Sequence, residues 1–167
     1  MLLLKALPTP VSLQKFASRY PGTDVQAISD FVSLLRATSD ISLALDRLLG
    51  QHGLLQGRWW ILVLLFREDD LTSSPSDLAE KAGVSKATIT GFLDGLEREG
   101  LVIRLPDPDD RRKYLIRLTA SGLQKLDEVT PDYNRKVHAF MSVLSSHQRT
   151  ELLDSLATLV SHLEVMR

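Results

Sequence analysis

The chain has 167 residues, of which 44% are hydrophobic and 25% are charged, and its formal net charge is −1. This composition is typical of one globular domain or of a core with appended helices, and the near-neutral charge excludes a uniformly basic coat for nonspecific nucleic-acid binding. There is no cysteine, which excludes disulfides, zinc–cysteine sites, iron–sulfur clusters and thiol nucleophiles.

The N-terminal third predicts helices. Residues 1–23 are punctuated by prolines, with a short helix expected at 12–20, and from Asp24 apolar residues recur at helical spacing as far as Leu49. Gly50 and Gly53 end that pattern. A second helix at 54–67 is apolar almost all round and should be buried. Its apolar run, residues 59–66, is too short to span a bilayer, so we expect a cytoplasmic protein.

The centre of the chain has the spacing of a helix-turn-helix. Ser74-Pro75-Ser76-Asp77 predicts a capped helix start, and the short helix ends near Ala82. Gly83 fits the turn with a positive φ, and Ser85 caps a second helix that runs to Glu99. Ala79 is small enough for a close helix crossing and Ile89 fills the core beneath the second helix. Leu78, Val84, Phe92 and Leu93 are the other candidates for burial.

The second of these helices begins with small, polar or basic residues, Ser85-Lys86-Ala87-Thr88, followed by Thr90. Hydroxyls and a lysine at a helix start can bond phosphates and base edges in a major groove, and Ala87 or the Thr88 methyl can touch a thymine methyl. The alternative is a capped surface helix without contact to nucleic acid.

Two β-like segments follow, Leu101–Leu105 and Tyr114–Leu118, joined by a turn-forming string. They predict a hairpin whose tip, Asp110-Arg111-Arg112-Lys113, has three cations, with Arg104 and Arg117 on the flanking strands. An arginine on a thin loop can enter a narrow minor groove. Asp110 is interpreted as the partner that orients the Arg112 guanidinium. The alternative is a solvated charged turn.

The last part of the chain predicts two more helices. Thr119 caps a long helix towards Leu144, and Ser145 with Gln148 has the spacing of a capping box. Apolar residues then alternate by four and three, as in a coiled-coil seam. They are Leu152, Leu156, Leu159, Leu163 and Met166.

The segment 110–119 resembles the wing of the MarR family of winged-helix transcription regulators, as do Asp107-Pro108 and Gly122, and 78–100 is similar to that family's helix-turn-helix. The resemblance covers residues 24–167. It implies a mainly α fold with a small β-wing, in which a winged helix-turn-helix core has N- and C-terminal dimerisation helices. Residues 1–50 would form an extension and a dimerisation helix, 54–118 the DNA-binding domain, and 119–167 a linking helix and the C-terminal dimerisation helix.

The implied function is a sequence-specific regulator, typically a repressor, that binds an inverted repeat in double-stranded DNA as a homodimer. Between residues 77 and 119 eight cations balance eight anions, so binding would depend on placed residues. The candidate DNA-contacting residues are Ser74, Ser76, Ser85, Lys86, Ala87, Thr88, Thr90, Arg111, Arg112 and Lys113, with Asp110 orienting the wing. The candidate dimer interface is Leu152, Leu156, Leu159 and Leu163.

Family members are often released from DNA by small aromatic or phenolic anions. By position, the ligand-pocket candidates are Arg36, His52, Arg58, Trp59 and Phe66, because aromatic rings can stack on a ligand and an arginine can pair its carboxylate. On an apolar helix, however, a tryptophan such as Trp59 is more often a core residue than part of a ligand pocket. The pocket therefore comes from the resemblance, and no particular effector is implied.

Other classes of function find little support. The chain lacks the GxSxG, HExxH, Walker and Rossmann patterns, and its four histidines are isolated. We therefore expect no enzymatic activity, no metal and no cofactor. The remaining alternative is a dimeric winged-helix module that binds another protein and not DNA. The aligned Asp–Arg pair of the wing tip favours the regulator, because a protein-binding scaffold does not need it.

Overall fold

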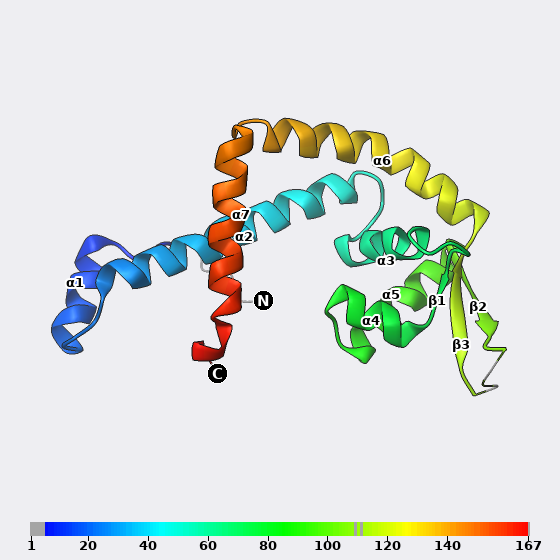
Figure 1. Cartoon of the computed structure of the whole chain (residues 1–167), viewed down its shortest axis with the longest axis horizontal. Helices are drawn as coiled ribbons and strands as arrows, with labels where there is room; N and C mark the ends of the chain where they lie inside the picture. The colour runs from blue at the N-terminus through cyan, green and yellow to red at the C-terminus, as the bar shows by residue number, and fades with distance from the viewer. Residues whose placement is uncertain (1–5, 109, 111, 167) are drawn as a thin grey trace. The chain divides into compact units, whose positions relative to one another are not determined.

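The computed structural model describes residues 6–108, 110 and 112–166 (Figure 1). The chain divides into two compact units, with the boundary after Trp60. In the first unit, α1 (Pro10–Arg19) begins two residues before the predicted helix because Thr9 caps it and Pro10 suits a first helical position. Helix α2 (Val25–Gly50) begins at its predicted cap, where the Asp24 carboxylate accepts the Ala27 N–H at 2.9 Å.

Helix α3 (Gln56–Phe66) is only partly buried, so the expectation of burial all round was wrong. Trp59, Ile61, Leu62 and Leu65 are at most 2% exposed, whereas Trp60 is 37% and Phe66 59% exposed. The reason is geometric, since a helix packed along one side leaves its opposite side open even when that side is apolar.

The second unit contains the predicted helix-turn-helix, formed by α4 (Pro75–Ala82) and α5 (Lys86–Arg98). Gly83 has φ 65°, which confirms the left-handed turn. The core beneath the two helices is apolar and fully or nearly fully buried. It includes Leu78, Ala79, Ile89, Leu93 and Leu96. The predicted core residues Val84, in the turn that joins α4 and α5, and Phe92, on α5, are only half-buried.

The wing is a three-stranded antiparallel sheet in the order β1-β3-β2. Strands β2 (Val102–Pro106) and β3 (Tyr114–Leu118) form the predicted hairpin, and Arg104 lies opposite Ile116. Strand β1 (Thr72–Ser73) pairs with Arg117 and Ile116 of β3. We did not predict β1, because two residues are too short to show an alternating pattern.

Helix α6 (Ala120–Met141) starts at the predicted cap, Thr119, whose hydroxyl accepts the Gly122 N–H at 3.0 Å and donates to the Gly100 carbonyl at 2.7 Å. Helix α7 (Ser146–Ser161) has the predicted capping box. It ends at Ser161, before the last part of the predicted seam, and residues 163–166 form the 3₁₀ helix η1 (Leu163–Met166). Among the described residues, no helix is long and apolar enough to cross a membrane.

Candidate nucleic-acid interface

The first turn of α5 presents the residues that the sequence assigned to a major groove. Ser85, Lys86, Ala87, Thr88 and Thr90 are all exposed. The Ser85 hydroxyl accepts the Thr88 N–H at 3.2 Å and lies 2.9 Å from the Thr88 hydroxyl, while Thr90 donates to the Lys86 carbonyl at 2.8 Å. These bonds hold the hydroxyls in defined positions at the start of the helix.

Lys86 occupies an electrostatically unfavourable place. It is the first residue of α5, whose first turn contains no acidic residue, and it makes no ion pair with the described residues. A cation at the positive end of a helix dipole does not stabilise the helix. An anionic partner from outside the chain would relieve this disfavoured charge.

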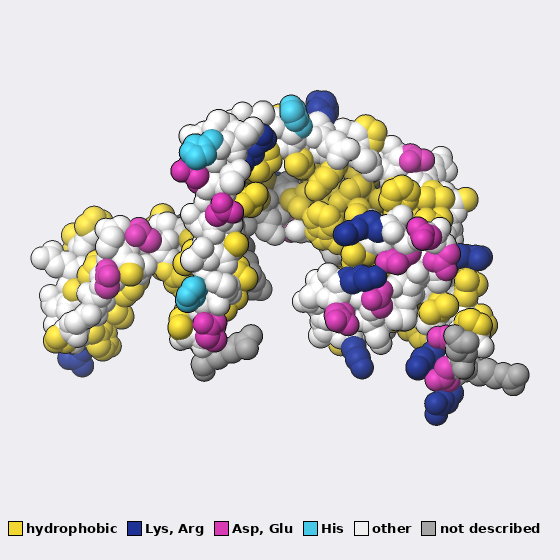
Figure 2. Space-filling view, viewed as in Figure 1, with side chains coloured by type: hydrophobic (Ala, Val, Ile, Leu, Met, Phe, Trp, Pro, Cys, Tyr) yellow, Lys and Arg dark blue, Asp and Glu magenta, His cyan; other side chains and the backbone are white. Residues whose placement is uncertain are grey.

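Asp110 contacts both Arg112 and Lys113 at the wing tip. Its carboxylate accepts the Arg112 backbone N–H at 3.0 Å and the Arg112 Nε–H at 3.3 Å, and it lies 3.5 Å from the Lys113 ammonium. These contacts, the backbone bond first, lower the pKa of Asp110 below its usual value. The Arg112 side chain is nevertheless 90% exposed. Lys and Arg side chains lie beside Asp and Glu side chains at this tip (Figure 2). Arg111 lies outside the described residues.

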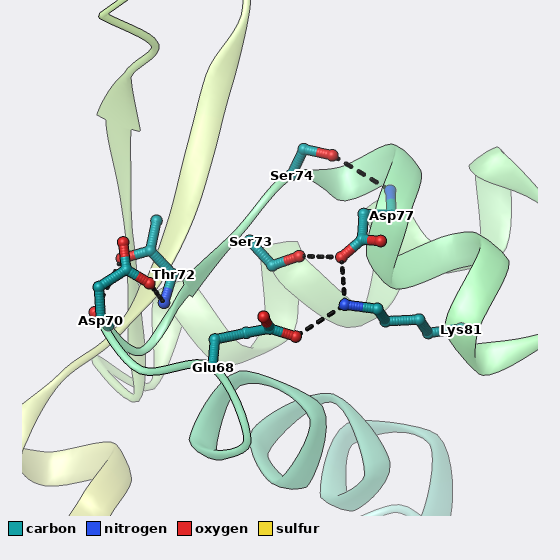
Figure 3. A network of polar contacts seen from close by, with 7 residues as sticks. All are labelled: Glu68, Asp70, Thr72, Ser73, Ser74, Asp77 and Lys81. Carbon is teal, nitrogen blue, oxygen red and sulfur yellow. Dashed lines mark hydrogen bonds and ion pairs between the residues drawn. The ribbon is translucent and has the colours of Figure 1, made fainter.

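Helix α4 is fastened at its N-terminus by a polar network that we did not predict (Figure 3). Asp77 accepts the Ser73 hydroxyl at 2.5 Å and the Lys81 ammonium at 2.8 Å, and Lys81 also contacts Glu68 at 2.7 Å. The hydrogen bond between Asp77 and Lys81 is the main cause that lowers the pKa of Asp77 and raises that of Lys81. The i,i+4 spacing of Asp77 and Lys81 was the available signal for this pair.

A cleft of about 530 Å³ lies between the starts of α4 and α5 and the wing. It brings together six of the predicted DNA-contacting residues, and Asp107, Ile89, Pro75 and Tyr114 complete its lining. The six are Ser74, Ser76, Lys86, Thr90, Arg112 and Lys113. Ser85, Ala87 and Thr88 are not in this lining, but they are exposed on the same first turn of α5. Hydroxyls and cations from three separate elements therefore share one open surface.

The ligand-pocket candidates differ widely in exposure. Trp59 is 2% and Phe66 59% exposed. Arg36 is ion-paired with Asp40 at 2.7 Å, and His52 and Arg58 are half-buried. None of the five lines the cleft beside the wing.

The predicted dimer residues of the C-terminal helices leave apolar surface open. Leu152 is 44%, Leu159 56% and Leu163 52% exposed, while Leu156 is half-buried. Water-exposed leucines at helical spacing indicate a surface that another apolar surface would cover.

A helix-turn-helix followed by a hairpin with a cationic tip defines a winged-helix DNA-binding protein. The comparisons with known proteins agree. Residues 54–114 match the model of the MarR family. The chain is 34% identical over 164 residues to the HTH-type transcriptional repressor YetL of Bacillus subtilis (strain 168), covering 98% of each chain.

Solved structures of the same family share the fold. AbsC, a MarR family transcriptional regulator from Streptomyces coelicolor, aligns with a TM-score of 0.76 and 27% identity over 85% of this chain and 96% of its own. Sco3205 from the same organism, solved in complex with DNA, aligns with a TM-score of 0.76 and 23% identity over 87% and 91%. This chain belongs to the MarR family and is a DNA-binding transcriptional regulator, not an enzyme.

Proposed function

We propose that the chain is a repressor that binds an inverted-repeat operator as a homodimer, with α5 in a major groove and the wing in an adjacent minor groove. The observation that carries this proposal is the cleft in which Ser74 and Ser76 of α4, Lys86 and Thr90 of α5, and the wing cations face the same side. A duplex meets all three elements only when they point the same way.

Each element has a distinct chemical task in this proposal. Ser74, Ser76 and Lys86 bond phosphates and set the register, which carries no sequence information by itself. Ala87 and Thr88 touch thymine methyls, and the Ser85 and Thr90 hydroxyls bond base edges or phosphates. Arg112, held by Asp110, enters the narrow minor groove, where the negative potential is strongest.

The homodimer is required by the size of the reading surface. One short helix reads only a few base pairs, and a two-fold pair would read two half-sites about 34–36 Å apart. The exposed leucines of α7 and η1 supply the apolar surface for pairing two subunits. Leu152, Leu156, Leu159 and Leu163 are therefore proposed at the interface.

A small effector would act on this dimer by population shift, binding better to a form in which the spacing of the two reading helices does not fit the operator. The proposed pocket uses Arg36, His52, Arg58, Trp59 and Phe66 and would take an aromatic anion. Of the two aromatic candidates, Phe66 is exposed and Trp59 is buried.

The test begins with selection of a bound duplex from a random-sequence library, followed by titration of that duplex. Arg112→Ala should weaken binding by about 1–3 kcal/mol. Lys86→Ala should lower the slope of log affinity against log salt by about 0.9 for each subunit, or about 1.8 for the homodimer. Arg98→Ala is the matched control, because Arg98 ends α5 and does not line the cleft. Equal effects of Arg98→Ala and Lys86→Ala would contradict the orientation of α5, and failure to select any duplex would favour the protein-binding alternative.

A further inference from the structure

Arg104 differs from the other cations of the wing because its guanidinium points back to α5. It extends from β2, and its Nη1 donates to Glu97 at 2.7 Å while its Nη2 donates to Asp94. The same guanidinium lies over the Tyr114 ring, 5.2 Å from the ring centroid. Its side chain is 31% exposed, and its Nε–H is buried without a hydrogen-bond partner among the described residues.

These contacts remove Arg104 from the set of cations available to DNA. Both terminal nitrogens are engaged by carboxylates, which raise the pKa of Arg104 further and keep it charged. Asp94 and Glu97 are three residues apart on α5 and lie on one face of that helix. The sequence analysis places Arg104 on a strand that flanks the wing tip, and the structure confirms this position in β2.

The three partners of Arg104 come from both sides of the cleft. Asp94 and Glu97 belong to α5, whose first turn lines the cleft through Lys86, and Tyr114 lines the cleft at the start of β3, directly after Lys113 of the wing tip. One side chain therefore connects the reading helix to the strand that carries the tip.

We propose that Arg104 is a positioning residue that fixes the wing relative to α5, so that the two elements meet their grooves in a single binding event. This inference rests on the proposed function. When α5 and the wing are held at a fixed separation, binding of one element to DNA places the other beside its groove at a high effective concentration. When Arg104 no longer holds the wing, the wing must be ordered as it binds DNA. This ordering costs free energy, so the affinity for DNA falls.

The sign of a charge change separates positioning from simple electrostatics. Removing a carboxylate from a DNA-binding surface should strengthen binding when only net charge matters. When Asp94 and Glu97 hold Arg104 in place, removing these two carboxylates should weaken DNA binding. We therefore expect the double variant Asp94→Asn/Glu97→Gln to bind the selected duplex about tenfold more weakly than the wild type, as should Arg104→Gln, with Arg104→Lys in between.

A second readout is the dependence on the wing tip. Since Arg104→Gln would already uncouple the wing, adding Arg112→Ala should cause little further loss. If Arg104 contributed only to general stability, the losses of DNA affinity caused by Arg104→Gln and by Arg112→Ala would multiply.

The geometry itself can be measured without DNA. The chain has no cysteine, so Arg98→Cys and Pro108→Cys place two spin labels, one at the end of α5 and one on the wing. In dimers diluted with unlabelled subunits, pulsed electron spin resonance should give a narrow distance distribution that broadens when Arg104→Gln is added.

Three outcomes would each overturn the proposal. The first is a carboxylate variant that binds as tightly as the wild type or more tightly. The others are multiplying effects of Arg104→Gln and Arg112→Ala on affinity, and a distance distribution that Arg104→Gln leaves unchanged. A wild-type protein that binds no duplex would overturn the proposed function instead. The spin-label distances alone would then decide whether Arg104 holds the wing.

Discussion

Gly122 gives a sharp test of how the helix after the wing is attached. It lies in the first turn of α6, where a Cβ would come 2.3 Å from the Leu101 carbonyl oxygen and 2.6 Å from Leu118 Cδ1. That oxygen also accepts the Thr119 N–H at 3.1 Å. The carbonyl is therefore held by the backbone and cannot turn aside as a flexible side chain would.

The size of the effect follows from these distances. An ordinary contact begins at 3.4 Å, so Gly122→Ala must move the helix start by about 1 Å. Overpacking of this kind lowers the free energy of unfolding by about 3 kcal/mol at the upper end of its range. Replacing a helical glycine by alanine raises the free energy of unfolding by about 1 kcal/mol. We expect a net loss of about 2 kcal/mol, which lowers Tm by about 4–8 °C in a chain of this length.

The assay is urea unfolding followed by tryptophan fluorescence at fixed protein concentration, since subunit association also affects apparent stability. Gly91→Ala is the matched control, because a Cβ at Gly91 has nothing within 4 Å and this residue lies inside α5. That variant should gain up to about 1 kcal/mol. Should Gly122→Ala prove as stable as the wild type, the close approach of α6 to Leu101 would be refuted.

Three further outcomes are expected. Thr119→Ala should lower the free energy of unfolding by about 1–2 kcal/mol in urea titrations, because it removes the cap of α6. Asp77→Asn should destabilise the protein at neutral pH. Because the folded pKa of Asp77 lies below its ordinary 3.8, the difference from the wild type should stay constant above that pH and shrink as the pH falls through the folded pKa, as measured by unfolding across that range. Leu156→Asp combined with Leu159→Asp should give monomers in analytical ultracentrifugation, and a persisting dimer would place the interface elsewhere.

Local features of the fold were predictable from the sequence. The caps at Ser74, Ser85, Thr119 and Ser145 were all found where their spacing indicated. The left-handed turn at Gly83 was found in the same way. Each depends on atoms within about one helical turn, so short sequence patterns contain the relevant information.

Long-range contacts were not predictable in this way. Lys81 and Glu68 are 13 residues apart, and only the folded chain brings α4 to the end of α3. The direction of Arg104 also depends on the fold, since its β2 position allows contact either with solvent or with α5. For the same reason, the apolar pattern of α3 did not show which of its sides would remain exposed.

Some cations of the second unit are paired away from the cleft and others line it, and this division sets the expected salt dependence of binding. Lys81 is paired with Asp77 and Glu68, and Arg104 with Asp94 and Glu97. The described cations that line the cleft are Lys86, Arg112 and Lys113. Two subunits would thus neutralise about six phosphates, which gives a slope of log affinity against log salt near −5, or near −7 with a contact from Arg111. If every cation between residues 77 and 119 faced DNA, the slope would approach −14. A measured value in that steeper range would show that the internal ion pairs open on binding.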